Sequence, residues 1–182
     1  MISRYCTLIA AVGLLATAAA RPEARTPTEY EVKAAFIYNF ARYVQWPGGS
    51  EQNKPFVIGV IGKDPFGPVL DDVVRGQSVQ GRAVVVRRFQ KIEHITNCDM
   101  LFVSGPESDH LQRIFDALDS APVLTVGDMD KFAELGGMIN LITEDNHIRF
   151  EMNVQAIERS GLKAGSQLLK LAKIVNERRL VK

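Results

Sequence analysis

The chain has 182 residues, of which 46% are hydrophobic and 24% charged, and it carries a formal net charge of +1 at pH 7. This length leaves room for one domain with a sizeable core. Apart from Arg4, 21 basic residues balance 21 acidic ones, which argues against a nucleic-acid partner because nucleic acids are bound by clustered positive charge.

The first 20 residues, MISRYCTLIAAVGLLATAAA, are typical of a cleaved secretory signal peptide. Arg4 supplies the positive start, residues 7–15 the apolar stretch, and residues 18–20 a small-residue cleavage site. The apolar stretch is too short to span a bilayer comfortably. Cys6 precedes that stretch, whereas a lipid anchor needs a cysteine after it. We therefore expect a soluble, exported protein, and the exact cleavage site stays open.

Cys98 is the only cysteine that remains after such a cleavage, so a disulfide within one chain is excluded by number. Its position in NCDMLFV, at the start of an apolar run, predicts a buried and unreactive thiol. A disulfide between two chains stays open if this thiol is exposed.

Residues 21–27 predict a short unstructured leader, and residues 28–178 the folded domain. Thr28 and Glu31 form a Thr-x-x-Glu capping box for a first helix, which Pro47 ends. Apolar residues recur along this helix at helical spacing, so most of it should be covered. We interpret it as scaffold rather than as a binding surface.

Six side chains in and just after this helix carry specific expectations. Phe36, Phe40 and Tyr43 are predicted to lie in the core. Asn39 is predicted to be a buried polar group that must find a backbone partner. Trp46 and Pro47 should plug the end of the helix.

Apolar runs then alternate with helical segments as far as residue 135. We expect strands at 55–62, 83–89, 99–104 and 121–127, and helices at 68–75, 106–118 and 128–135. Short strands that are apolar throughout are typical of a parallel sheet buried on both faces. The alternation predicts an α/β fold, a three-layer, largely parallel sheet flanked by helices.

The last part of the chain has a different pattern. Runs at 137–142 and 147–153, separated by the polar turn TEDN, predict an antiparallel hairpin with one solvated face. Two helices should follow, at 154–159 and 166–178. The second is amphipathic and basic, which suits a helix on a membrane surface or a partner as well as one docked on the sheet. We favour docking because the apolar stripe has the width that a packed helix needs.

No sequence motif indicates catalysis, a cofactor or a metal. The glycines at 59, 62 and 67 match neither a dinucleotide-binding nor a P-loop pattern. The three histidines lie far apart, outside any zinc-binding spacing, and no nucleophile motif is present. We therefore expect no enzyme, no cofactor and no metal site.

Several motifs in order resemble the YfiR family. They are Y-x-x-K-A-A-F-I-Y-N-F-A-R-Y-V-x-W-P at 30–47, F-V-I-G-V-I-G-x-D-P-F at 56–66, V-L-T-V-G-D at 123–128, G-G-M-I-N-L…N-H-I-R-F-E-M-N at 136–153 and G-L-K-x-x-S-x-L-L-x-L-A at 161–172. The resemblance implies a periplasmic regulator that binds and represses an inner-membrane diguanylate cyclase, lowering cyclic di-GMP and biofilm formation. Some relatives carry paired cysteines that respond to redox conditions, whereas this chain keeps only Cys98 in its mature part.

Two hypotheses about sites follow. For a protein partner, we expect a mixed patch of Arg149, Glu151, Ile157 and Lys163 at the hairpin and beyond it, although Ile157 packing inward is the competing interpretation. The alternative function is that of a periplasmic small-ligand-binding sensor that acts on a different membrane signalling partner. For a ligand that sets the regulatory state, we expect the loops at the carboxyl ends of the parallel strands, namely 62–64, 104–105 and 127–128. A homodimer stays open.

Overall fold

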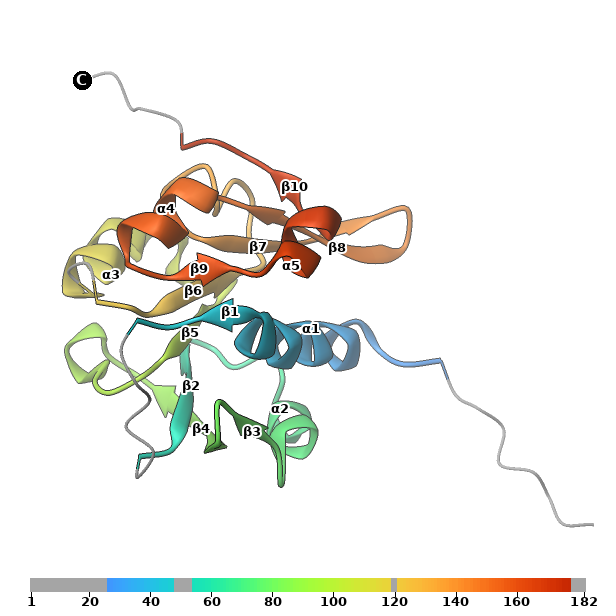
Figure 1. Cartoon of the computed structure of the whole chain (residues 1–182), viewed down its shortest axis with the longest axis vertical. Helices are drawn as coiled ribbons and strands as arrows, with labels where there is room; N and C mark the ends of the chain where they lie inside the picture. Colours follow the sequence, from blue (N-terminus) through green and yellow to red (C-terminus); the bar gives the residue numbers. More distant parts are fainter. Residues whose placement is uncertain (1–25, 48–53, 119–120, 178–182) are drawn as a thin grey trace, which may run out of the picture.

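The computed structural model describes residues 26–47, 54–118 and 121–177 of the chain. The expected signal peptide and residues 21–25 of the expected leader lie outside these ranges. The helices are α1 (Glu29–Tyr43), α2 (Pro68–Val74), α3 (Leu111–Leu118), α4 (Val154–Arg159) and α5 (Ser166–Leu171). The strands are β1 (Val44–Gln45), β2 (Phe56–Ile61), β3 (Ser78–Val79), β4 (Arg82–Phe89), β5 (Met100–Val103), β6 (Leu124–Gly127), β7 (Ile139–Glu144), β8 (His147–Met152), β9 (Lys163–Ala164) and β10 (Lys173–Ile174). Figure 1 shows them in chain order.

The capping box starts α1 as the sequence predicts. Thr28 Oγ1 accepts the Glu31 backbone N–H at 3.4 Å, and the Glu31 carboxylate accepts the Thr28 N–H at 2.7 Å. Each bond satisfies a backbone donor that the helix end would leave without a partner. The buried face of α1 centres on Phe40, whose ring packs edge-on against Phe150 at 5.0 Å between centroids.

The other predictions for α1 have mixed outcomes. Phe40 is fully buried, but Phe36 is half-buried and Tyr43 is 36% exposed, so the prediction of a core position is wrong for Tyr43. Asn39 is half-buried rather than buried. Trp46 does close the end of the helix, because its ring packs edge-on against Phe56 and its Nε1 donates to the Asp99 carbonyl at 3.1 Å.

The largest sheet has eight strands in the order β10-β8-β7-β6-β5-β2-β4-β3. Its centre is parallel, from β4 through β2, β5 and β6 to β7. The hairpin β7–β8 and the pair β3–β4 are antiparallel, and β10 joins β8 in parallel. The predicted fold class, a largely parallel sheet flanked by helices with a hairpin near the C-terminus, is confirmed.

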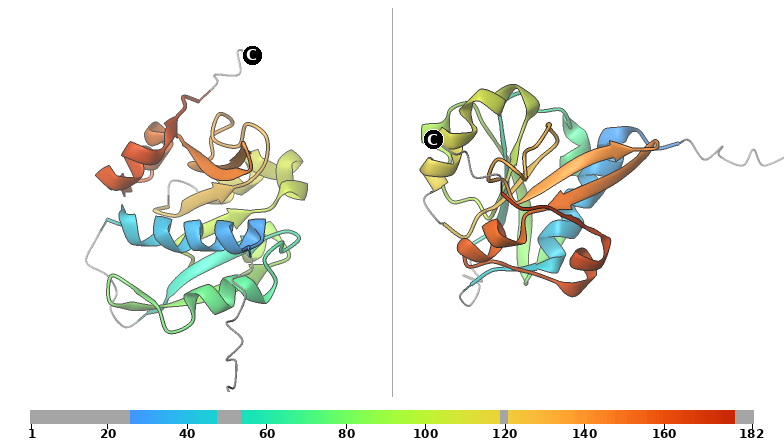
Figure 2. Two further views of the ribbon diagram at one scale, coloured as in Figure 1. Left: turned by 90° about the vertical axis from the view of Figure 1, so that its right-hand side faces the viewer. Right: turned by 90° about the horizontal axis from the view of Figure 1, so that it is seen from above.

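The sheet separates two groups of apolar side chains. Helices α1, α2, α4 and α5 pack on one face, where Phe40 and Ile157 lie in the larger cluster. Helix α3 packs on the other face, where Ile114 lies with Phe132 from the loop after β6. Figure 2 shows these layers from two further directions.

Two of the expected helices differ in the structure. Residues 131–136 form turns instead of a helix, because Lys131 has a left-handed φ of 58° and Phe132 inserts into the core. The expected helix at 106–118 begins as a 3₁₀ turn, Gly105–His110, before α3.

The C-terminal helix is also much shorter than expected. It ends at Leu171, and the chain continues as β10, where Lys173 pairs with Glu151 and the Val175 N–H donates to the Met152 carbonyl at 3.0 Å. The edge of β8 thus offers backbone partners that end the helix early. The short pair β1–β9 was not foreseen, and it ties the end of α1 to the segment before α5.

Candidate functional site

The loops after β2 and β5 are two of the three at which a ligand is expected; in the first, Asp64 is occupied by the protein itself, whereas in the second the buried Ser104 Oγ has no hydrogen-bond partner among the described residues. A Cβ on Gly62 would lie 2.5 Å from Ser104 Oγ, so these two loops already touch. The Asp64 carboxylate accepts the Phe66 N–H at 2.8 Å and the Arg88 Nε at 2.8 Å. These bonds hold the loop after β2 in place, and the third expected loop, after β6, lines a polar cavity.

A polar cavity of about 340 Å³ opens where β6 ends. Strand β7 pairs with β6 only at Ile139 and Asn140, but continues to Glu144 alongside β8. Residues 141–144 of β7 therefore have no partner strand on the β6 side among the described residues. The cavity lies there, between this part of β7, the loop after β6 and the first half of α1. The lining residues are Glu29, Lys33, Asp128, Met129, Asp130, Lys131, Glu134, Asn140, Leu141, Ile142, Thr143 and Glu151.

One wall of the cavity is a buried ion pair between α1 and the end of β6. The side chains of Lys33 and Asp128 are only 5% and 7% exposed, and Lys33 Nζ lies 2.8 Å from Asp128 Oδ2 and 2.7 Å from Glu29 Oε1. Tyr30 also donates its hydroxyl to Asp128 Oδ2 at 3.1 Å. Burial disfavours the charged form of Lys33, but its hydrogen bonds to both carboxylates prevail and raise its pKa. Lys33 is therefore a fixed cation.

The opposite wall is a second polar network on the hairpin. Asn140 Nδ2 donates to Glu151 Oε2 at 3.2 Å, and Lys173 Nζ of β10 lies 3.1 Å from Glu151 Oε1. The hydrogen bond to Glu151 and its negative charge raise the pKa of Lys173. Glu151 was expected on a solvated face, but the residue is only 9% exposed, because β10 pairs with β8 at this position and Lys173 lies against its carboxylate. Glu151 thus links the cavity to the C-terminal strand.

The other residues of the expected partner patch do not gather in one place. Ile157 is fully buried against the sheet, so the competing interpretation of that residue is correct. Arg149 is exposed and pairs with Glu144 at 3.3 Å across the hairpin. Lys163 is exposed on β9, opposite Gln45. Partner binding by Arg149 and Lys163 stays a prediction.

A different surface, on α5 and β10, carries apolar side chains. Leu171 is 74% exposed, Ile174 is 50% exposed, and Leu169 is 38% exposed, whereas Leu168 of the same helix is buried. The sequence pattern missed this surface because it assigned all these residues to one docked helix. The early end of α5 turns Leu171 and Ile174 outward.

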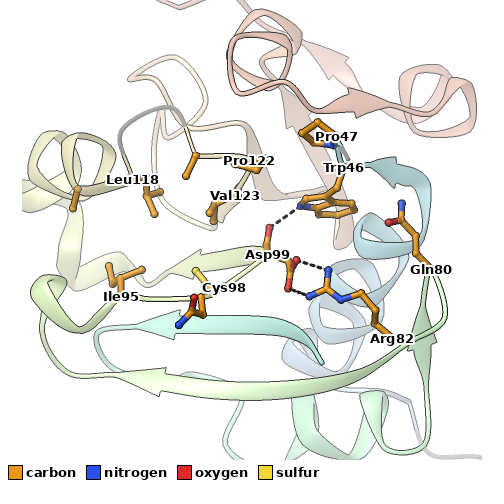
Figure 3. A pocket seen from close by; sticks show the side chains of 13 residues that line it. Trp46, Pro47, Gln80, Arg82, Ile95, Cys98, Asp99, Leu118, Pro122 and Val123 are labelled. Atoms are coloured by element: carbon orange, nitrogen blue, oxygen red, sulfur yellow. Dashed lines mark hydrogen bonds and ion pairs between the residues drawn. The ribbon is translucent and has the colours of Figure 1, made fainter. Parts of the chain in front are cut away.

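At the other edge of the sheet lies a second cavity, of about 360 Å³ (Figure 3). The charged groups of Arg82 and Asp99 in its lining form hydrogen bonds that hold neighbouring strands together. Arg82 Nη1 and Nη2 donate to Asp99 Oδ1 and Oδ2 at 2.7 and 2.8 Å, and the same guanidinium donates to the Pro55 carbonyl at 2.6 Å. Asp99 Oδ2 also accepts the Val57 N–H at 2.8 Å. This pair joins β4, β2 and β5, and we interpret the cavity as structural.

Cys98 lines this second cavity and is half-buried. Burial, followed by the nearby negative charge of Asp99, raises the pKa of its thiol to about 12. The thiolate is the reactive form of cysteine, so this shift disfavours reaction near neutral pH. Cys98 is not fully buried as expected, and its low reactivity stays a prediction.

Within the described ranges, no group of three or more His, Cys, Asp or Glu side chains is placed to hold a metal ion. In the part of the chain that the structure describes, no helix has the length and apolar character needed to cross a membrane. The sites offer a polar cavity with fixed charges and an exposed apolar surface.

The model of the YfiR/HmsC-like family matches residues 30–173, from the first turn of α1 to the start of β10. The match therefore includes both walls of the polar cavity. This family is one of periplasmic regulators of cyclic di-GMP signalling.

Proposed function

Because the chain belongs to the YfiR/HmsC-like family, we propose that it is a periplasmic protein that binds and represses an inner-membrane diguanylate cyclase. Repression lowers cyclic di-GMP and with it biofilm formation. The protein acts by contact with the periplasmic part of that membrane partner and not as an enzyme. The observation that carries the proposal is the family match over almost the whole described domain.

The contact surface that we propose is the exposed part of α5 and β10. Leu171 and Ile174 supply an apolar centre of the kind that protein interfaces bury. Lys170 of α5 and Lys173 of β10 supply exposed charged groups on the same two elements. Partner binding by Arg149 on β8 and Lys163 on β9 is a separate part of the proposal. The surface is unlike the sheet, whose central strands are covered on both faces.

The test is a gene deletion in a strain that contains the cyclase. Deletion should raise cyclic di-GMP, and the wild-type gene should restore the low level. Leu171→Asp with Ile174→Asp should fail to restore it, since both side chains are exposed and their replacement leaves the core intact. The control is Ala117→Asp on the exposed face of α3, which should restore the low level.

Two results would reject the proposal at different levels. Unchanged cyclic di-GMP on deletion would remove the repressor function itself. Full repression by the double variant, with circular dichroism showing a native fold, would mean that the protein is a repressor but that its contact surface lies elsewhere.

A second candidate function, favoured by the polar cavity, is that of a sensor whose regulatory state is set by a small ligand. The cavity lies at the carboxyl end of β6, where parallel sheets bind ligands. It shares Glu151 with Lys173 of β10, so a ligand that contacts Glu151 acts next to the proposed contact surface. A thermal-shift screen of periplasmic metabolites tests it, and no stabilisation at saturating concentrations counts against it.

A further inference from the structure

We propose that the cavity at the end of β6 binds a small organic cation with a primary ammonium group. The proposal rests on the sensor candidate above and gives it a site and a ligand class. Binding is measured on the purified protein alone. If the purified protein does not bind the ligand, the proposed repression of a cyclase is not affected. If the protein does not repress a cyclase, ligand binding can still be measured.

The first observation is an excess of negative charge around the cavity. The carboxylates that line it are those of Glu29, Asp128, Asp130, Glu134 and Glu151, and the ammonium groups are those of Lys33 and Lys131. Lys33 is engaged by two of these carboxylates, Lys131 pairs with Asp130, and Lys173, beside the cavity, pairs with Glu151. The five carboxylates still outnumber the three ammonium groups. Charges lining one concave site act together and attract ligands of the opposite sign. The cavity therefore favours a cation over a neutral molecule or an anion.

The second observation is a hydrogen-bond acceptor without a partner. Asn140 is 1% exposed and lines the cavity, and its Oδ1 accepts no hydrogen bond from any residue that the structure describes. The orientation of the amide is fixed, because Nδ2 must face the Glu151 carboxylate at 3.2 Å. A buried polar atom without a partner carries a desolvation penalty, which a donor from a ligand removes.

The two observations select an organic ammonium group. An ammonium group carries three N–H donors and one positive charge, so it can donate to Asn140 Oδ1 and to a carboxylate at once. A metal ion is a poorer match, because the described side chains offer no group of three ligands for one. A cavity of about 340 Å³ has the size of small-ligand sites in proteins.

Isothermal titration calorimetry with 1,4-diaminobutane at low ionic strength tests the proposal, with 1,4-butanediol as the neutral probe of the same length. The diamine should bind saturably and the diol should not. Asn140→Leu, which removes the acceptor, should weaken binding about tenfold or more. Added salt should weaken it further, since it screens the carboxylates.

A matched pair of surface variants guards against misfolding. Asp130 lines the cavity with a side chain that is 86% exposed, so Asp130→Lys should keep the fold and weaken diamine binding at least tenfold. Glu93→Lys makes the same charge change on a residue outside the cavity and should bind as the wild type. The proposal is overturned by absent diamine binding, by equal binding of the diol, by unchanged affinity in Asp130→Lys, or by equal loss in Glu93→Lys.

Discussion

The pair between Arg82 and Asp99 makes the sharpest prediction about stability. Their side chains are only 12% and 16% exposed, and Asp99 neutralises a guanidinium that lies against the Phe56 ring, 5.3 Å from its centroid. Breaking a buried pair by removing one charge costs about 3–5 kcal/mol, because the other charge stays buried. Asp99→Asn keeps the shape and one acceptor, so we expect the lower end, about 3 kcal/mol. For a domain of this size the melting temperature should fall by roughly 6–12 °C.

Urea unfolding can be followed by the fluorescence of Trp46, the only tryptophan, whose Nε1 donates to the Asp99 carbonyl. Asp72→Asn is the control, because Asp72 pairs with Arg75 on the surface with 58% of its side chain exposed. That change should alter the free energy of unfolding by no more than about 0.5 kcal/mol. Arg82→Met combined with Asp99→Asn should cost much less than the sum of the two single changes. A loss below about 1 kcal/mol in Asp99→Asn would refute the reasoning that this pair is a buried structural tie.

Three further predictions follow from other sites. A Cβ on Gly137 would lie 2.3 Å from the buried Phe132 ring, whereas one on Gly105 would meet nothing within 4 Å. Gly137→Ala should therefore lower the unfolding free energy by about 1–3 kcal/mol and Gly105→Ala by less than about 0.5 kcal/mol, and equal urea midpoints would contradict this. The raised pKa of Cys98 predicts slow reaction with Ellman's reagent at pH 8 in the native protein and fast reaction in urea; a fast native reaction would show an accessible thiolate. Because the unfolded thiol ionises near its ordinary pKa of 9.0 and the native one near about 12, stability should fall with rising pH between these values, and Cys98→Ala should reduce that fall.

Local signals in the sequence determined much of the fold. The capping box of Thr28 and Glu31 depends on residues three positions apart, so it could be identified without any tertiary contact. The apolar runs of β2, β5 and β6 are buried at every position, as strands inside a parallel sheet must be. The alternation of such runs with helices therefore predicted the architecture, and the ordered motifs predicted the family.

Only the tertiary structure decided where the chain departs from its local preferences. Residues 172–175 continue a helical pattern, but the edge of β8 supplies backbone partners that a pattern along one segment does not reveal. The same pairing buries Glu151, which alternation along its own strand placed in solvent. The polar cavity lies where β6 ends after only two positions paired with β7, and Lys33 reaches Asp128 across 95 positions of sequence. Strand register and long-range ion pairs depend on contacts between segments that are distant in the sequence. The spacing of residues within one segment therefore cannot predict them.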